Sequence, residues 1–189
     1  QLRAILRASA FGDIRVMYPM ISGIEELRKM NDVMDEAKDG LRSDGICFNE
    51  NIRTGTVIEI PSAALTADIL IKEADFFSIG TNDLIQYTFA VDRGNEAVVS
   101  YYNPLNPAIL RLIKKTVESA HKNFKSVSVC GEMAGEPHLA FLLLGLGVDE
   151  LSVSPASILQ VKKVVRNVNF KDAFQVAETV LKMEKAEEI

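Results

Sequence analysis

The chain has 189 residues, of which 48% are hydrophobic and 25% are charged, which is enough for one globular domain with a buried core. Its formal net charge of −5 at pH 7 excludes a general attraction for nucleic acid or an anionic membrane surface. No apolar run approaches the ~20 residues that a membrane-spanning helix requires. The two cysteines, Cys47 and Cys130, form neither a metal-binding spacing nor a disulfide framework, so we expect a reducing, cytoplasmic compartment.

Short apolar segments alternate with segments of helical spacing along the whole chain. We expect the end of a helix at 2–10, a strand at 14–21, a helix at 25–41, a strand at 54–60, a helix at 61–72, a strand at 75–80, a helix at 107–123, a strand at 126–130, a helix at 137–144, a strand at 150–154, and helices from 157 and 171. The strands are apolar almost throughout, as in a parallel sheet covered on both faces. The alternation predicts an α/β fold with right-handed crossovers.

An open doubly wound sheet and a TIM (β/α)8 barrel both fit this alternation. Polar side chains at the ends of the strands favour the barrel, because a barrel gathers its strand ends around one mouth, where its active site lies. These side chains are Glu59, Asn82, Asp83, Cys130, Glu132 and Ser154. No Gly-x-Gly-x-x-Gly pattern follows the first strand, which disfavours a dinucleotide-binding fold. We therefore expect residues 1–189 to form one domain, an incomplete TIM-type barrel of about its last five βα units.

Two carboxylates form a candidate metal site. Glu59 lies in an otherwise apolar strand, where a carboxylate is costly unless it is paired or bound to a cation. A salt bridge, or a cap on the helix after Pro61, is the alternative. Asp83 directly follows the next strand and can cap a following helix, which does not exclude metal binding. On neighbouring strand ends the two would offer hard oxygen ligands suited to Mg²⁺.

Arg93 is a candidate phosphate ligand. It lies in the loop 91–95, where Gly94 indicates a turn. The guanidinium group can bind a phosphate through two parallel hydrogen bonds. An ion pair with Asp92 or Glu96 inside the loop explains Arg93 equally well.

Cys130 ends a strand and precedes Gly131. At a barrel mouth its thiol could act as an acid or a nucleophile, although a buried cysteine is most often only a small apolar residue. His121 and His138 have no serine or cysteine partner at a recognisable spacing, so we expect no nucleophilic triad.

Five segments in this order and spacing resemble the signature blocks of the phosphoenolpyruvate-utilising enzymes. They are 57–63 (Val-Ile-Glu-Ile-Pro-Ser-Ala), 75–84 (Asp-Phe-Phe-Ser-Ile-Gly-Thr-Asn-Asp-Leu), 86–88 (Gln-Tyr-Thr), 90–95 (Ala-Val-Asp-Arg-Gly-Asn) and 129–132 (Val-Cys-Gly-Glu). The resemblance covers nearly the whole chain, and the block from Phe76 to Leu84 is highly specific. Segment 90–95, with 1–8, 20–21 and 103–107, is similar to enzyme I of the bacterial sugar phosphotransferase system. Pyruvate phosphate dikinase and phosphoenolpyruvate synthase are the alternatives.

The resemblance implies a role for each candidate residue. Glu59 and Asp83 would hold Mg²⁺, Asn82 and Arg93 would hold the phosphate of phosphoenolpyruvate, and Cys130 would protonate the enolate of pyruvate. It also implies a histidine on a separate N-terminal domain, which takes the phosphoryl group and passes it to the carrier protein HPr to drive sugar uptake. Two further substrate-binding arginines belong to earlier strands of the family.

Without that histidine and those arginines, we expect the chain alone to have no turnover. A non-enzymatic binding or dimerisation module is the alternative function, and family members form homodimers through this barrel. Five strands also leave two open sheet edges, at 15–20 and at 151–154, so we expect the chain to associate and not to form a closed monomer.

Overall fold

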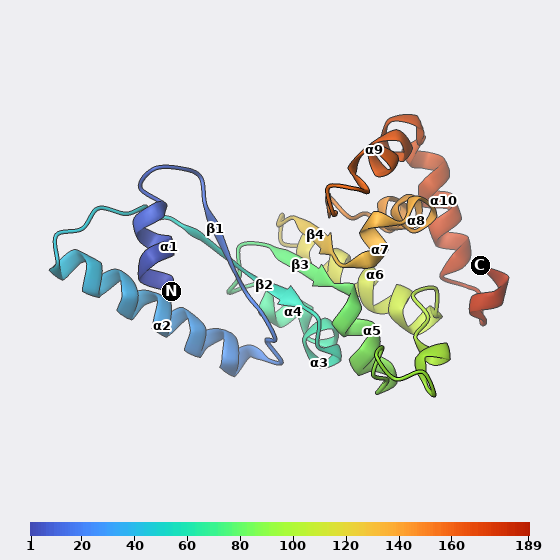
Figure 1. The fold of residues 1–189 in the computed structure, drawn as a ribbon, viewed down its shortest axis with the longest axis horizontal. Helices are drawn as coiled ribbons and strands as arrows, with labels where there is room; N and C mark the ends of the chain where they lie inside the picture. The colour runs from blue at the N-terminus through green and yellow to red at the C-terminus, as the bar shows by residue number, and fades with distance from the viewer.

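A computed structural model describes all 189 residues as alternating strands and helices (Figure 1). The strands are β1 (Arg15–Tyr18), β2 (Arg53–Ile58), β3 (Phe77–Gly80), β4 (Val127–Cys130) and β5 (Glu150–Ser152). The helices are α1 (Leu2–Ala8), α2 (Ile24–Ser43), α3 (Pro61–Leu65), α4 (Ala67–Leu70), α5 (Thr81–Phe89), α6 (Pro107–His121), α7 (Glu132–Gly135), α8 (Pro137–Leu146), α9 (Ile158–Asn167) and α10 (Phe170–Val180), with 3₁₀ turns η1 (Val99–Tyr101) and η2 (Ala186–Glu188).

All of the expected strands are present, and the helices differ from expectation in two ways. The helix expected at 61–72 is divided into α3 and α4 at Thr66, whose hydroxyl donates to the Ser62 carbonyl at 2.8 Å. Such a local bond competes with the helical backbone pattern. Helices α5 and α7, which directly follow β3 and β4, were not expected as elements. Their polar first turns resemble loop sequence.

The five strands form one parallel sheet in the order β1-β2-β3-β4-β5. Each strand lies beside the strand before it in sequence, as in a TIM barrel, whereas a doubly wound sheet reverses direction at a switch point. The sheet is open, because β1 pairs only with β2 and β5 pairs only with β4. The two expected edges are therefore present, and the fold is a five-stranded α/β sheet of the barrel type.

The two faces of the sheet differ in polarity. One face is apolar and packs against the helices through side chains such as Ile58, Phe77 and Val129, which are all fully buried. The opposite face carries a row of polar side chains in register, with Ser78 paired to Ser128 on the next strand. Branched apolar residues usually fill the inside of a TIM barrel. Here serines and Glu150 border a cavity of about 200 Å³ on that face.

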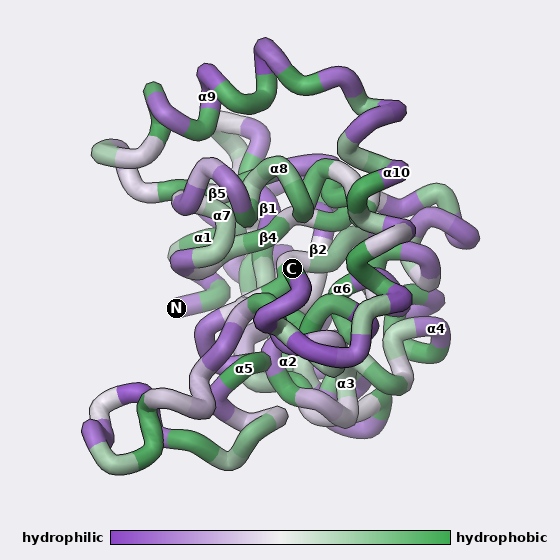
Figure 2. Tube along the Cα trace, turned by 90° about the vertical axis from the view of Figure 1, so that its right-hand side faces the viewer, coloured by the Kyte–Doolittle hydropathy of each residue, from purple (hydrophilic) through white to green (hydrophobic).

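The C-terminal helices form a separate layer at one end of the molecule, while α1 and α2 lie at the other end (Figure 1). Helix α8 packs closely on α10 at Gly145. A Cβ added there would lie only 2.2 Å from the Ala173 carbonyl oxygen, so the contact requires a glycine. Helix α9 lies on the outside, where hydrophobic and hydrophilic residues alternate along it (Figure 2). Leu159 on this helix is 79% exposed. None of the helices combines the length and the apolar content needed to cross a bilayer.

Candidate functional site at the carboxyl ends of the strands

The sequence-predicted polar residues gather at the carboxyl end of the sheet. Glu59 directly follows β2, Asn82 and Asp83 lie in the first turn of α5 after β3, and Cys130 is the last residue of β4. Because β2, β3 and β4 are parallel neighbours, these residues share one edge. Asp83 is not the N-cap of α5, since that position is Gly80. The capping alternative for Asp83 is therefore wrong.

Glu59 is fixed by the backbone around it. Its side chain is buried, and Oε1 accepts the backbone N–H of Met20 at 2.7 Å. Met20 presents that N–H from a left-handed conformation, with φ of 57°. The other oxygen, Oε2, passes over Gly80, where an added Cβ would lie 2.7 Å away. A side chain at position 80 would therefore displace the carboxylate.

Glu59 and Asp83 interact with each other. Burial raises the pKa of Glu59 above its usual value, the Met20 N–H opposes this shift, and the nearby Asp83 carboxylate adds to it. Two carboxylates side by side at a partly buried position fit a divalent cation, which would neutralise both charges. The structure contains no group of three or more His, Cys, Asp and Glu side chains placed to hold a metal. Water and substrate oxygens would have to complete the coordination, an arrangement that Mg²⁺ accepts.

Asn82 joins the ends of β3 and β4. Its Oδ1 accepts the backbone N–H of Glu132 at 3.0 Å. Gly131, with φ of 124°, lets the ends of β3 and β4 lie close together, because a Cβ at position 131 would lie only 2.4 Å from the Thr81 hydroxyl. Asn82 and Cys130 line the same cavity, of about 480 Å³, at the mouth of the sheet. We call it the mouth cavity. The side-chain NH₂ of Asn82 forms no hydrogen bond within the protein and can donate to a ligand.

Arg93 is tied to the site through Tyr102. The Tyr102 hydroxyl donates to the backbone carbonyl of Asn82 at the long distance of 3.4 Å. Burial and the charge of Glu132 raise the pKa of Tyr102, while the adjacent Arg93 guanidinium lowers it. Arg93 does not form the alternative ion pair with Asp92 inside the loop. Asp92 Oδ1 instead accepts the Gly94 N–H at 2.8 Å. Arg93 itself is exposed.

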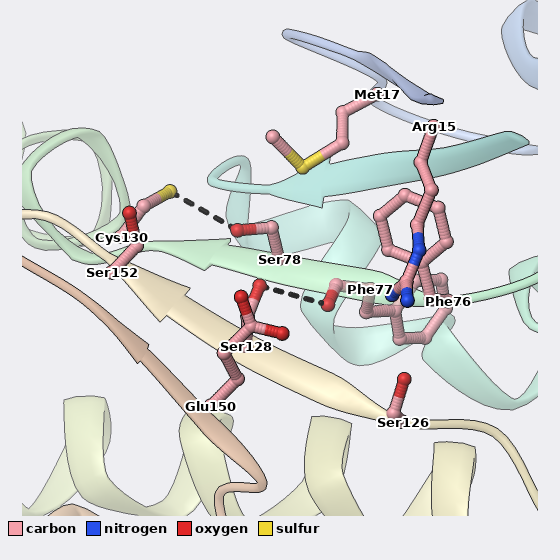
Figure 3. Close-up of a pocket in the computed structure, with 10 residues that line it drawn as sticks. All are labelled: Arg15, Met17, Phe76, Phe77, Ser78, Ser126, Ser128, Cys130, Glu150 and Ser152. Atoms are coloured by element: carbon pink, nitrogen blue, oxygen red, sulfur yellow. Dashed lines mark hydrogen bonds between the residues drawn. The ribbon is translucent and has the colours of Figure 1, made fainter. Parts of the chain in front are cut away.

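Cys130 lies between two cavities. It lines the mouth cavity and also the cavity of about 200 Å³ on the polar face of the sheet, which we call the inner cavity. Its sulfur accepts the hydroxyl of Ser78 at 3.2 Å, and Figure 3 shows the two side chains pointing toward one another from neighbouring strands. Cys130 is only partly buried, and it contributes to the wall of the mouth cavity.

The two histidines lie apart from this cluster. His121 bonds to Asp149 at 2.9 Å, and Asp149 also accepts the N–H of Val127 at the opposite end of β4. His138 lines neither cavity. Sequence reasoning missed Met20, Ser78 and Tyr102. A search for polar residues on the same strand face as Cys130 would have found Ser78, whereas Met20 acts only through its backbone.

Among solved structures, the fold is similar to a crystal structure of a citrate lyase from Burkholderia xenovorans LB400. The TM-score is 0.63 at 16% sequence identity, and the match covers 98% of this chain and 59% of that chain. At this identity the similarity concerns the fold alone.

Curated relatives match every residue of the chain. Phosphoenolpyruvate-protein phosphotransferases are 51% identical in Haemophilus influenzae, 47% in Buchnera aphidicola and 48% in Priestia megaterium, each over all 189 residues. The chain spans 33% of the length of each of these relatives. The family described as PEP-utilising enzyme, PEP-binding domain, matches residues 1–170. The chain therefore belongs to the PEP-binding domain family of the phosphoenolpyruvate-utilising enzymes.

Proposed function

We propose that this chain is the C-terminal, phosphoenolpyruvate-binding part of a cytoplasmic phosphoenolpyruvate-protein phosphotransferase of the enzyme I type. The observation that carries the proposal is 51% identity to such an enzyme across all 189 residues. The complete enzyme would move the phosphoryl group of phosphoenolpyruvate to a histidine and then to HPr, and would release pyruvate. The 189 residues would form the last five βα units of its barrel.

The acceptor histidine is proposed to lie outside these 189 residues. His121 is bonded to Asp149 at the far end of the sheet, and His138 lines neither cavity. The chain would accordingly bind phosphoenolpyruvate and support its chemistry only together with the rest of the enzyme.

Glu59 and Asp83 are proposed to hold Mg²⁺. The pairing of two carboxylates at a partly buried position, with Glu59 fixed by Met20, supports this role. When bound, Mg²⁺ would supply positive charge beside the phosphate and enolate oxygens of the substrate. The two side chains contribute a fixed pair of oxygen ligands, and Gly80 leaves the space they need.

Asn82 and Arg93 are proposed to bind the phosphate. The side-chain NH₂ of Asn82 is free to donate, while the side-chain oxygen accepts the Glu132 N–H. Arg93 lies beside Tyr102, which contacts the backbone of Asn82. Phosphoryl transfer depends on positioning and charge neutralisation more than on covalent help, so an amide donor and a guanidinium group are suited to it.

Cys130 is proposed to protonate the enolate of pyruvate that remains after phosphoryl transfer. Its thiol borders the mouth cavity beside Asn82, which would hold the phosphate. A group that donates its proton in the chemical step must lie within reach of the reacting carbon, and Cys130 is the titratable residue at the end of β4 that lines both cavities.

The proposal also includes a homodimer. The exposed hydrophobic side chains on the outer helices, Leu159 of α9 and Phe170 of α10 among them, support an interface on this part of the chain. A module that only binds or dimerises is the competing function. Calorimetric titration with Mg²⁺ and phosphoenolpyruvate separates the two, since a dimerisation module would bind neither.

A chimeric enzyme tests the proposal. The matching third of the Haemophilus influenzae relative is replaced by this chain, and pyruvate formation from phosphoenolpyruvate and phosphorylation of HPr are measured. We expect both activities to depend on Mg²⁺. The same chimera carrying Glu59→Gln serves as the inactive control. A folded chimera that binds HPr but forms no pyruvate would disprove the proposed function.

A further inference from the structure

We propose that Ser78 is a positioning residue for Cys130. The Ser78 hydroxyl orients the Cys130 thiol and donates a hydrogen bond to the sulfur when the thiol becomes a thiolate. The inference rests on the proposed function, in which Cys130 gives a proton to the enolate. It concerns a residue inside the sheet that does not line the mouth cavity.

The burial of Ser78 is the first argument. The residue is 1% exposed, and its hydroxyl donates to the Cys130 sulfur at 3.2 Å, which is its one hydrogen bond in the structure. A buried hydroxyl without a partner is costly, so this contact satisfies Ser78 as well as orienting Cys130. Sulfur is a weak acceptor as a thiol and a much stronger one as a thiolate, because hydrogen bonds to charged acceptors are stronger.

The register of the strands explains why Ser78 reaches the sulfur. Directly opposite Cys130 on β3 is Gly80, which has no side chain. Ser78 lies two residues earlier on the same strand face, opposite Ser128. With position 80 empty of a side chain, the Ser78 hydroxyl extends diagonally to Cys130 (Figure 3). The Ser128 hydroxyl, by contrast, bonds to the Phe77 carbonyl at 3.4 Å and not to the sulfur.

The chemistry requires such a donor. In the proton transfer, the S–H bond of Cys130 breaks and its electron pair stays on sulfur. The carbon–carbon double bond of the enolate supplies the electrons for the new C–H bond, and the enolate oxygen becomes the carbonyl of pyruvate. The thiolate then takes a proton from solvent water, which restores the thiol for the next cycle.

Charged groups line both cavities. Arg15 and Glu150 line the inner cavity, and Glu132 and Glu136 line the mouth cavity. The Glu59 carboxylate lies over Gly80, the register partner of Cys130. Ser78 offers a neutral donor within hydrogen-bond distance of the sulfur. Its contribution is a hydrogen bond to the thiolate that the transfer leaves behind.

Alkylation of the 189-residue chain tests this role without substrate or metal. Iodoacetamide modifies only the thiolate, and peptide mass spectrometry follows Cys130 separately from the exposed Cys47. We expect Ser78→Ala to slow alkylation of Cys130 roughly tenfold near pH 7 and to move its pH profile upward, because a hydrogen bond to a charged group is lost. Ser78→Thr, which keeps the hydroxyl, should restore most of the rate.

Ser128→Ala is the matched control, since it removes a hydroxyl from the register partner of Ser78 without touching the sulfur. It should leave the alkylation rate of Cys130 unchanged, and Cys47 should react alike in all variants. Equal rates in Ser78→Ala and the unchanged chain would overturn the proposal. If Ser78→Ala does not fold, a Ser78→Thr rate roughly tenfold below that of Ser128→Ala would also overturn it.

The chimeric enzyme supplies the second readout. We expect Ser78→Ala to lower kcat for pyruvate formation roughly tenfold and to leave KM for phosphoenolpyruvate nearly unchanged, the pattern of a group used in the chemical step. A folded chimera without the Ser78 substitution that binds HPr but forms no pyruvate would reject the proposed function. An active chimera whose Ser78→Ala variant keeps the full kcat would reject only the role of Ser78.

Discussion

The carbonyl oxygen of the Asn82 side chain accepts the backbone N–H of Glu132 at 3.0 Å and so joins the carboxyl ends of β3 and β4. The bond fixes the orientation of the amide, so that the NH₂ group and not the oxygen is available to a ligand. A single side chain thereby connects two neighbouring βα units and, in the proposed function, contacts the phosphate. The two tasks can be separated by substitution.

Asn82→Asp should separate structure from binding. The aspartate keeps an acceptor for the Glu132 N–H, so the melting temperature should change little. Its negative charge replaces the NH₂ donor and repels phosphate, so phosphoenolpyruvate binding by the chimera should weaken at least about tenfold. Asn82→Ala loses both contacts and should also lower stability by about 1 kcal/mol. Calorimetric titration and thermal unfolding check the pair, and equal binding by the aspartate variant and the unchanged chain would contradict the phosphate role.

Glu59 should make the metal-free chain less stable as pH rises. Its pKa in the folded state is raised above the ordinary value of 4.5, mainly by burial, so folding favours its protonated form. The stability from this preference is fully present below the ordinary pKa and is lost as pH rises through the raised value. At pH 7 without metal, Glu59→Gln should therefore unfold at a higher temperature than the unchanged chain, by a few degrees.

Adding Mg²⁺ at pH 7 should reverse that order. The ion stabilises the folded state to which it binds, so it should raise the melting temperature of the unchanged chain and not that of Glu59→Gln. Glu184→Gln removes a carboxylate from an exposed position and should behave like the unchanged chain in both conditions. A Mg²⁺ response that survives in Glu59→Gln would place the ion elsewhere.

Arg93 should affect both substrate binding and turnover. In the chimera, Arg93→Ala should raise KM for phosphoenolpyruvate and lower kcat, because a bidentate partner of the phosphate is lost. Arg93→Lys should restore little, since an ammonium group cannot supply two parallel hydrogen bonds. Unchanged steady-state kinetics in the alanine variant would remove Arg93 from the site.

Cys130 should affect the chemical step alone. In the chimera, Cys130→Ala should slow pyruvate formation by about 100-fold or more, the usual contribution of a positioned acid, while the dissociation constant for phosphoenolpyruvate stays nearly the same. Binding is measured by calorimetry and turnover by a pyruvate assay on the same preparation. Parallel losses of binding and turnover would indicate that Cys130 has a packing role.

The open edges of the sheet should make the isolated chain associate. β1 and β5 each leave one side unpaired, and an unpaired edge is a template for another chain. Light scattering should report a mass above the 20.8 kDa of one chain. Met17→Lys, on the edge strand β1, should reduce association, while Phe11→Lys, exposed but outside the strands, should not. A monomer that unfolds cooperatively would contradict this expectation.

The strands and the positions of most site residues could be predicted from the sequence. Apolar runs identify the five strands, and the residues at or just beyond the ends of these runs include Glu59, Asp83 and Cys130, because parallel strands end at one edge. The positions of Met20 and Ser78 relative to the site could not be read in this way. Met20 binds Glu59 through its backbone N–H, whose direction depends on the left-handed φ of Met20. Ser78 reaches Cys130 because the residue opposite Cys130 on β3 is Gly80, which has no side chain.

The order of the strands has a consequence for how the chain is made. Every strand pairs with the strand that comes immediately before or after it in sequence. Each newly synthesised βα unit can therefore dock on the unit that left the ribosome just before it, without waiting for a distant partner. The carboxylate pair needs only the residues up to the first turn of α5, which holds Asp83, so this part of the site can assemble while α8, α9 and α10 are still being translated.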